Sequence, residues 1–122
     1  MASELTINFS LSYAKGESKI NVPSKSMLVD VASQVRAANT QIIGTTHEAL
    51  QMLDISSAGS AYFLNTDATN YVDIGVEVSS AFYGLIRLMP GQFAYCPCLA
   101  TNSPYAKANT AAINLEYIIF SQ

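Results

Sequence analysis

The side chains with the most reactive chemistry in this sequence are two cysteines and a single histidine. Cys96 and Cys98 flank a proline, so on a strand both thiols would point the same way, and a bond between them would close a strained ring. A zinc site needs about four ligands and a thiolate nucleophile needs a nearby base, but His47 lies far from both cysteines in the sequence. We therefore interpret the cysteines as free thiols of a reducing compartment and expect no metal site. Zinc ligands pooled around a symmetry axis remain the alternative.

The other polar groups match no enzyme motif. Asp73 and Glu77 would share one face of a strand and could form a carboxylate pair, although solvated charges on an outer face explain them more simply. The sequence contains no G-x-S-x-G elbow, no Walker motif and no G-x-G-x-x-G loop. We therefore expect that the protein is not an enzyme and has neither catalytic residues nor a cofactor.

One polar segment could bind a hard cation. In AYFLNTDATNYVDIG, residues 61–75, a cluster of Asn, Asp and Thr lies between two apolar runs. The segment lacks the D-x-D-x-D-G spacing and the closing Glu of a calcium loop, and Asp67 alone gives such a site little charge. The same side chains close turns by bonding to their own backbone. The pattern therefore favours two strands joined by a polar turn.

The low charge content indicates what class of protein this is. Only 12% of the residues are charged, about half of the roughly 25% typical of soluble domains, whereas 50% are hydrophobic. Such a chain often buries part of its surface against other subunits, so we expect a homo-oligomer. The net charge of −3 offers no basic surface for nucleic acid or an anionic membrane.

The length and the N-terminus set further limits. A chain of 122 residues can bury one core, so residues 1–122 are predicted to be a single domain, with residues 1–12 as a possible docking strand or arm. The sequence has no apolar run of about 18 residues and no basic segment followed by an apolar one at its start. We expect a protein that is neither exported by a signal peptide nor inserted in a membrane.

Alternating apolar and polar residues predict the elements that position these groups. The clearest strand has apolar residues at every second position from 5 to 13, and a polar turn leads to a returning strand, 18–22, that ends at Pro23. Residues 27–35 favour a strand over a helix, and 47–53 fit one helical turn or a short strand. Further strands are predicted at 41–43, 61–64, 71–79, 81–88, 93–99, 105–108 and 114–120. The prediction is an all-β fold, an antiparallel β-sandwich (jelly-roll-like) of about eight to ten short strands.

The aromatic residues could also form a contact surface. Most tyrosines in a sheet pack across strands, but some can contact a saccharide or another subunit. The candidate interface residues are Leu5, Ile7, Phe9, Leu11, Tyr83, Tyr95 and Tyr105.

About two-thirds of the chain, from Gln41 to Phe120, resembles small structural proteins of tailed bacteriophages. The similarity lies in a Y/F-x-x-N-x-D-A-T-N-Y-V-x-I/L-G segment, an L-x-P/A-G-E/Q turn before an apolar strand, and a final A-N-T-A-A-x-x-L-E-Y-x-I strand, with GTTHEAL upstream. Two features depart from the pattern: Cys96-Pro97-Cys98 interrupts an apolar strand, and the first forty residues carry no family motif.

The resemblance implies a non-enzymatic virion protein with a β-sandwich fold. The function expected from it is that of a capsid decoration or cement protein, a homotrimer that binds the major capsid protein and stabilises the head. Such a protein would be made in the bacterial host cytoplasm and lie on the capsid surface of the virion. A tail, neck or fibre component is the first alternative, and a carbohydrate-binding module is the second.

Overall fold

The computed structural model describes residues 4–32, 34 and 36–121, and its regular structure is entirely β-strand. In this part of the chain there is no helix that could cross a membrane. The prediction of an all-β fold is confirmed. In chain order the strands are β1 (Leu5–Lys15), β2 (Ser18–Val29), β3 (Arg36–Ile43), β4 (Glu48–Ala49), β5 (Ala58–Asn65), β6 (Val72–Val78), β7 (Ala81–Leu88), β8 (Phe93–Cys96), β9 (Tyr105–Ala108) and β10 (Ile113–Ser121).

The chain divides into two compact units, Met1–Val31 and Ala32–Gln122. The sequence led us to expect one sandwich domain with an arm at residues 1–12. The structure instead assigns the sandwich to the second unit alone, and the first unit is a hairpin of two long strands, β1 and β2. The sequence did not reveal this division because residues 1–31 have the same alternating pattern as the strands of the sandwich.

A tight turn at Gly16 and a bulge set the pairing register of the two strands of the hairpin. Gly16 takes a φ of 60° at the first position of the two-residue turn, as in the type II′ turns that suit twisted hairpins. The register then shifts where Phe9 and Leu11 face Lys25 and Val22. Pro23 lies in this shift, where a missing N–H group costs little, so β2 continues past it to Val29. The expectation that the returning strand ends at Pro23 is therefore wrong.

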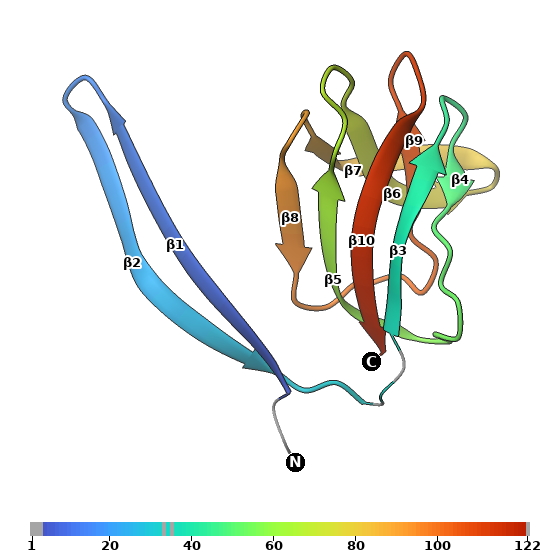
Figure 1. Cartoon of the computed structure of the whole chain (residues 1–122), viewed down its shortest axis with the longest axis horizontal. Coiled ribbons are helices and arrows are strands. Elements are labelled where there is room, and N and C mark those ends of the chain that lie inside the picture. The colour runs from blue at the N-terminus through green and yellow to red at the C-terminus, as the bar shows by residue number, and fades with distance from the viewer. Residues whose placement is uncertain (1–3, 33, 35, 122) are drawn as a thin grey trace. The chain divides into compact units, whose positions relative to one another are not determined.

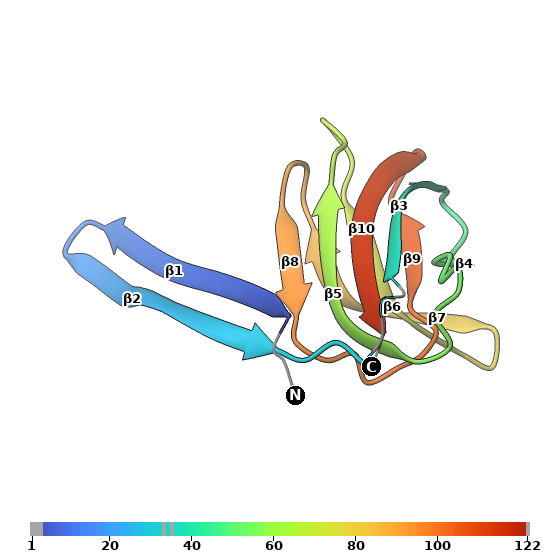
Figure 2. The same ribbon diagram turned by 60° about the horizontal axis from the view of Figure 1, so that its bottom comes forward.

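The second unit is a sandwich of two antiparallel four-stranded sheets, with strand orders β3-β10-β5-β8 and β4-β9-β6-β7. Figures 1 and 2 show the two sheets as separate layers, with β10 and β5 at the centre of the first. The side chains between the layers are almost all apolar, and the largest of them are Tyr117 and Phe63. The core is completed by Ala37, Ile43, Leu50, Ile55, Ala58, Ala61, Val72, Ile74, Leu88, Ala106, Ala108, Ile113, Leu115 and Ile119.

A polar network around Tyr117 joins the first sheet to the segment that follows β4. The Tyr117 hydroxyl lies 2.8 Å from Gln41 Oε1 and 3.0 Å from the Gln51 carbonyl, either of which can accept its proton. It also accepts a hydrogen bond from the Gln51 N–H at 2.9 Å. Burial raises the pKa of Tyr117 above its ordinary value of 10.0. The network satisfies a hydroxyl that would otherwise be buried without a partner.

The Tyr117→Phe variant is expected to lose about 1–2 kcal/mol of unfolding free energy, because it removes the hydrogen bonds between this hydroxyl and Gln41 and Gln51. Because the folded-state pKa is raised, the hydroxyl stabilises the fold fully below pH 10.0, and its contribution is lost as the pH rises past that value. The difference between wild type and variant should therefore shrink in alkali. Urea unfolding at neutral and alkaline pH measures it, with Tyr83→Phe, which removes an exposed hydroxyl, as the control. Equal losses in the two variants would contradict the network's role.

Candidate assembly surfaces

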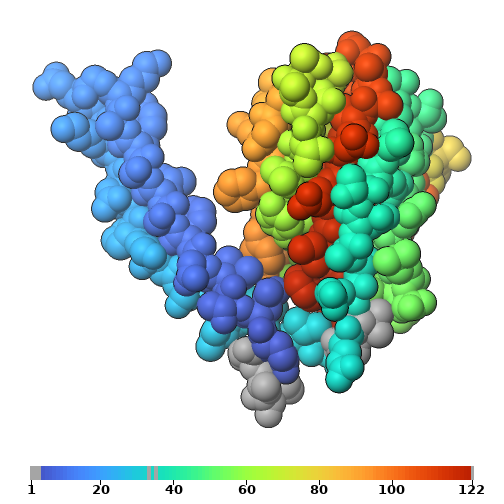
Figure 3. All heavy atoms as spheres, in the orientation of Figure 1, coloured from blue at the N-terminus to red at the C-terminus, as the bar shows by residue number. Residues whose placement is uncertain are grey.

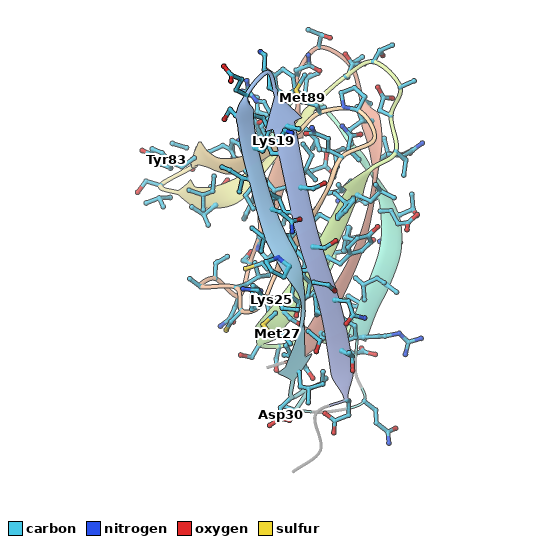
Figure 4. The ribbon with its side chains drawn as sticks, turned by 90° about the vertical axis from the view of Figure 1, so that its left-hand side faces the viewer. Lys19, Lys25, Met27, Asp30, Tyr83 and Met89 are labelled. Atoms are coloured by element: carbon cyan, nitrogen blue, oxygen red, sulfur yellow. The ribbon has the colours of Figure 1, made fainter. Side chains whose placement is uncertain are left out.

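One face of the hairpin is almost entirely apolar. Residues directly opposite each other in antiparallel strands share a face, and the pairs on this one include Ile7 with Met27 and Leu11 with Val22. Its charged residues are Lys15, which pairs with Ser18 beside the turn, and Lys25, opposite Phe9 within the apolar part (Figure 4 labels Lys25 and Met27 on β2). We call this surface the apolar hairpin face, and its members are Leu5, Ile7, Phe9, Leu11, Tyr13, Ile20, Val22, Lys25, Met27 and Val29.

The first unit has no second layer of its own to cover this face, because its described residues form a single two-stranded sheet. The Phe9 side chain is 50% exposed, and Leu11, Tyr13 and Ile20 are exposed as well. A two-stranded hairpin alone is marginally stable in water at best. The apolar hairpin face is therefore a candidate surface for contact with another protein.

The first sheet of the sandwich has a second apolar surface on the side away from the core. Along β10 the side chains of Leu115, Tyr117 and Ile119 are buried, so the alternate positions face outward. Figure 3 views the sandwich from this side, where β8, β5, β10 and β3 run next to one another. We call it the outer sheet face, and its members are Arg36, Ala38, Thr40, Ile42, Tyr62, Leu64, Phe93, Tyr95, Asn114, Glu116, Ile118 and Phe120.

Large apolar side chains on the outer sheet face are open to solvent. Ile42 is 67% exposed and Phe93 is 70% exposed. The rings of Tyr62 and Phe93 lie 6.4 Å apart in a tilted arrangement across β5 and β8. The charged residues are Arg36 at one end, opposite Phe120, and Glu116 in the middle, between Thr40 and Leu64. A face of this composition is typical of a protein interface.

The turn between β6 and β7 carries a third apolar surface. Ser79 and Ser80 both take positive φ angles, 52° and 68°, as in the type I′ turns that join twisted strands. Leu85 is 73% exposed, and Figure 4 shows Tyr83 on the projecting end of this hairpin. We call this surface the β6–β7 tip, and its exposed apolar members are Val78, Tyr83 and Leu85.

The outer face of the second sheet is charged. Arg87 donates to both carboxylate oxygens of Asp73, at 2.8 and 3.1 Å, and its guanidinium lies 3.9 Å from the centroid of the Tyr71 ring. The hydrogen bond to Asp73 raises the pKa of Arg87. A shallow cavity of about 300 Å³ beside this pair is lined by Asp73, Gly84, Leu85, Ile86 and Arg87. Its charged groups are paired with each other.

His47 lies in a cluster on the same sheet. Its Nε2 is 2.8 Å from Glu77 Oε2, and its ring stacks on Phe82 at 5.6 Å and tilts against Tyr105 at 5.8 Å. Asp73 and Glu77, considered as a carboxylate pair in the sequence, are therefore each bound to a different basic side chain.

The two cysteines lie at the end of β8 and in the loop that follows it. The Cys96 thiol donates to the Cys98 carbonyl at 3.3 Å, and both thiols are free. Within the described residues, no group of three or more His, Cys, Asp and Glu side chains is arranged to hold a metal ion.

The polar segment at residues 65–70 forms the turn that the sequence predicts. The buried Asn65 side chain donates to the carbonyls of Asn70 and Leu88, at 2.9 and 3.0 Å, and so connects β5 of one sheet to β7 of the other. The Asp67 carboxylate accepts hydrogen bonds from the backbone N–H groups of Asn70 and Thr69, at 2.7 and 3.0 Å. The side chains of Asn65, Asp67 and Asn70, considered as cation ligands, are therefore engaged in hydrogen bonds with the turn and its neighbours.

Acid is expected to weaken this turn. The backbone N–H groups of Asn70 and Thr69 lower the pKa of Asp67 below its ordinary value of 3.8. A lowered pKa contributes stability that is present above pH 3.8 and is lost as the pH falls through the folded-state value. The Asp67→Asn variant should therefore lose less of its melting temperature in acid than the wild type does, and Asp54→Asn in an exposed turn is the control. Parallel melting curves for wild type and Asp67→Asn against pH would contradict this role.

The candidate interface residues from the sequence lie on four separate surfaces. Leu5, Ile7, Phe9 and Leu11 share the apolar hairpin face, whereas Tyr83 is on the β6–β7 tip. Tyr95 belongs to the outer sheet face, and Tyr105 contacts His47 on the second sheet. The sequence did not reveal that Ile42 and Phe93 are exposed, or that the half-buried Ile118 and Phe120 face away from the core. The signal was the run Tyr-Ile-Ile-Phe at residues 117–120, which is apolar on both faces of a strand.

Comparisons with protein-family models, with curated proteins and with solved structures found no match to this chain. The similarity to bacteriophage virion proteins therefore depends on the sequence motifs alone.

Proposed function

We propose that this chain is a non-enzymatic structural protein of a tailed bacteriophage virion. As a capsid decoration protein, it would associate with copies of itself and bind the major capsid protein on the surface of the head. The observation that carries the proposal is the apolar hairpin face, which belongs to a two-stranded unit without a core of its own. Contact with another protein is the simplest way to cover such a face.

Two further features support an assembly role. The chain has half the usual content of charged residues and carries exposed apolar side chains on the outer sheet face and the β6–β7 tip. Three apolar surfaces let one subunit contact several neighbours at once. The motifs between Gln41 and Phe120 connect this assembly role to phage particles.

A decoration protein acts by mass action. A subunit that binds the assembled shell and not the separated capsid proteins stabilises the shell by RT ln(1 + [L]/Kd), about 2.7 kcal/mol at one hundred times Kd. The β6–β7 tip, with Tyr83 and Leu85 exposed, offers a surface for the major capsid protein, while the other surfaces join copies of this chain. A trimer would suit the local three-fold positions of an icosahedral shell.

The test compares phage heads with and without this protein. Heads that lack it should release their DNA at a lower temperature and on milder osmotic shock, and adding back the purified protein should restore their resistance. A Tyr83→Ser, Leu85→Ser variant should restore less than the wild type, and Tyr105→Phe serves as a control outside the tip. Heads that resist heat equally with and without the protein would rule out the decoration role. A few copies per particle at one vertex would instead favour a neck or tail component.

A further inference from the structure

We propose that the apolar hairpin face of one copy packs on the outer sheet face of a second copy, with Lys25 beside Glu116. The inference deepens the proposed function, because it names the contact through which copies of this chain associate, and it rests on that function for their association. The partner of the apolar hairpin face is therefore a second copy of this chain.

The two faces are similar in their strand arrangement and in their length. Both consist of outward side chains on twisted antiparallel strands, the arrangement in which two sheets pack face to face at about 10 Å. The 11 residues of β1 extend about 36 Å, and the nine residues of β10 extend about 30 Å. A hairpin laid along β10 and β5 would therefore cover the full length of the sheet, and its width of two strands would cover the centre of the face.

The charges on the two faces are complementary. Lys25 is the charged side chain within the apolar hairpin face, which ends before Lys15 at the turn, and Glu116 is the one acidic side chain of the outer sheet face. Each lies four residues from an end of its face, Lys25 from Val29 and Glu116 from Phe120. Neither takes part in an ion pair with another described residue.

A lysine covered by apolar surface is costly unless a carboxylate pairs with it. Two hairpin faces packed on each other would bring two lysines together, which disfavours that arrangement. The outer sheet face carries the Glu116 carboxylate in the middle of an apolar surface. Glu116 can therefore pair with Lys25 while apolar side chains surround the two charges.

The size of the contact also fits. In a reciprocal pair, each copy would contribute ten side chains from its hairpin and twelve from its sheet face, which falls within the roughly 20–30 residues a side of a standard interface. In a ring, each contact would join ten side chains of one copy to twelve of the next. Because the contact joins two different surfaces, it is heterologous. It gives a reciprocal pair, a ring where the rotation between copies closes, or an open filament where the rotation does not close. A ring of three copies is consistent with the proposed trimer.

The test uses charge reversal in the full chain. Lys25→Glu and Glu116→Lys each place two like charges in the contact and should each raise the dissociation constant of the oligomer about tenfold or more, as measured by light scattering over a concentration series. Lys19→Glu is the matched control, because Lys19 pairs with Ala14 on the opposite face of the hairpin and should leave the oligomer unchanged. Circular dichroism checks that every variant keeps its strand content.

Mixing the two single variants separates a contact between copies from one within a copy. In an equimolar mixture, each contact between unlike copies joins one carboxylate to one ammonium group. The mixture should therefore form linked pairs of unlike copies and reach a higher mass than either variant alone, although a ring of three cannot be built from unlike contacts only. If the mixture stays dissociated while the Lys25→Glu, Glu116→Lys double variant recovers, the contact lies within one copy and the inference is overturned. A wild type that is monomeric at every concentration, or a Lys25→Glu variant with unchanged mass, also overturns it.

The failure of this inference is distinguishable from the failure of the proposed function. Adding the Lys25→Glu variant to heads that lack the protein measures head binding directly. If this variant keeps the oligomer mass of the wild type and protects the heads fully, the proposed contact between copies is wrong and the decoration role stands. If the wild type forms its oligomer through this contact but gives the heads no protection, the decoration role is wrong and the inference about the contact stands.

Discussion

The Gly75→Ala variant is expected to lose about 3 kcal/mol or more of unfolding free energy, at or above the upper end of the roughly 1–3 kcal/mol that overpacking a core typically costs. Gly75 is buried in β6, opposite Gly84 of β7, where the register of the two strands shifts. A Cβ atom at position 75 would overlap the carbonyl oxygen of Tyr83. Because that oxygen belongs to the backbone of the paired strand, it cannot rotate away, and β7 would have to move.

Gly84→Ala is the matched control for this prediction. The nearest heavy atoms to a Cβ at position 84 lie 3.4 Å away, on the side chains of Asp73 and Phe82, which can adjust. The control should cost less than about 1 kcal/mol. Urea unfolding monitored by circular dichroism measures both variants under the same conditions. Similar costs in the two variants would show that the close approach of β6 and β7 does not determine stability here.

The double variant Phe9→Ser, Leu11→Ser is expected to abolish self-association. Both side chains are exposed in the single chain and lie next to each other on the apolar hairpin face. Covering a Phe or Leu side chain contributes about 1.5–3 kcal/mol each, so losing both corresponds to roughly a thousandfold weaker association. Sedimentation velocity over a concentration series measures the change.

Asn8→Ala with Ser12→Ala is the control for the hairpin. These residues pair with Ser26 and Asn21 on the opposite, polar face of the same strands. The control variant should sediment like the wild type while the Phe9→Ser, Leu11→Ser variant sediments as a monomer. If both double variants keep the wild-type sedimentation coefficient, the apolar hairpin face is not what holds copies together.

The alternation of side chains predicts which residues face inward, but it does not predict which strands pair. Periodicity revealed the strand at residues 5–13 and the strands on both sides of the turn at 65–70, because each of these runs has one apolar face. It could not reveal that β10, the last strand in the chain, lies between β3 and β5. That position depends on long-range packing of residues such as Tyr117 and Phe63, and local sequence does not encode it.

The candidate surfaces were predicted only in part for a similar reason. The apolar hairpin face follows from alternation in β1. Its β2 half is predicted as two separate strands, 18–22 and 27–35, because Pro23 is interpreted as a strand end. The outer sheet face escaped prediction because an apolar residue on a strand is expected to face a core. Ile118 and Phe120 lie on the side opposite the core, and only the pairing with β3 and β5 reveals it. The residues 33 and 35 of the predicted strand 27–35 lie outside the described residues, and the rest of it is β2 as far as Val29.

The central claim is that this protein is a subunit of a phage head, and its location in purified virions tests that claim most directly. Antibodies against the chain, used for immunogold labelling in electron microscopy, should label the whole surface of the head, and quantitative mass spectrometry should find copies in proportion to the major capsid protein. Labelling confined to the tail or neck would contradict the decoration role. Absence of the protein from purified virions would contradict a structural role in the particle altogether.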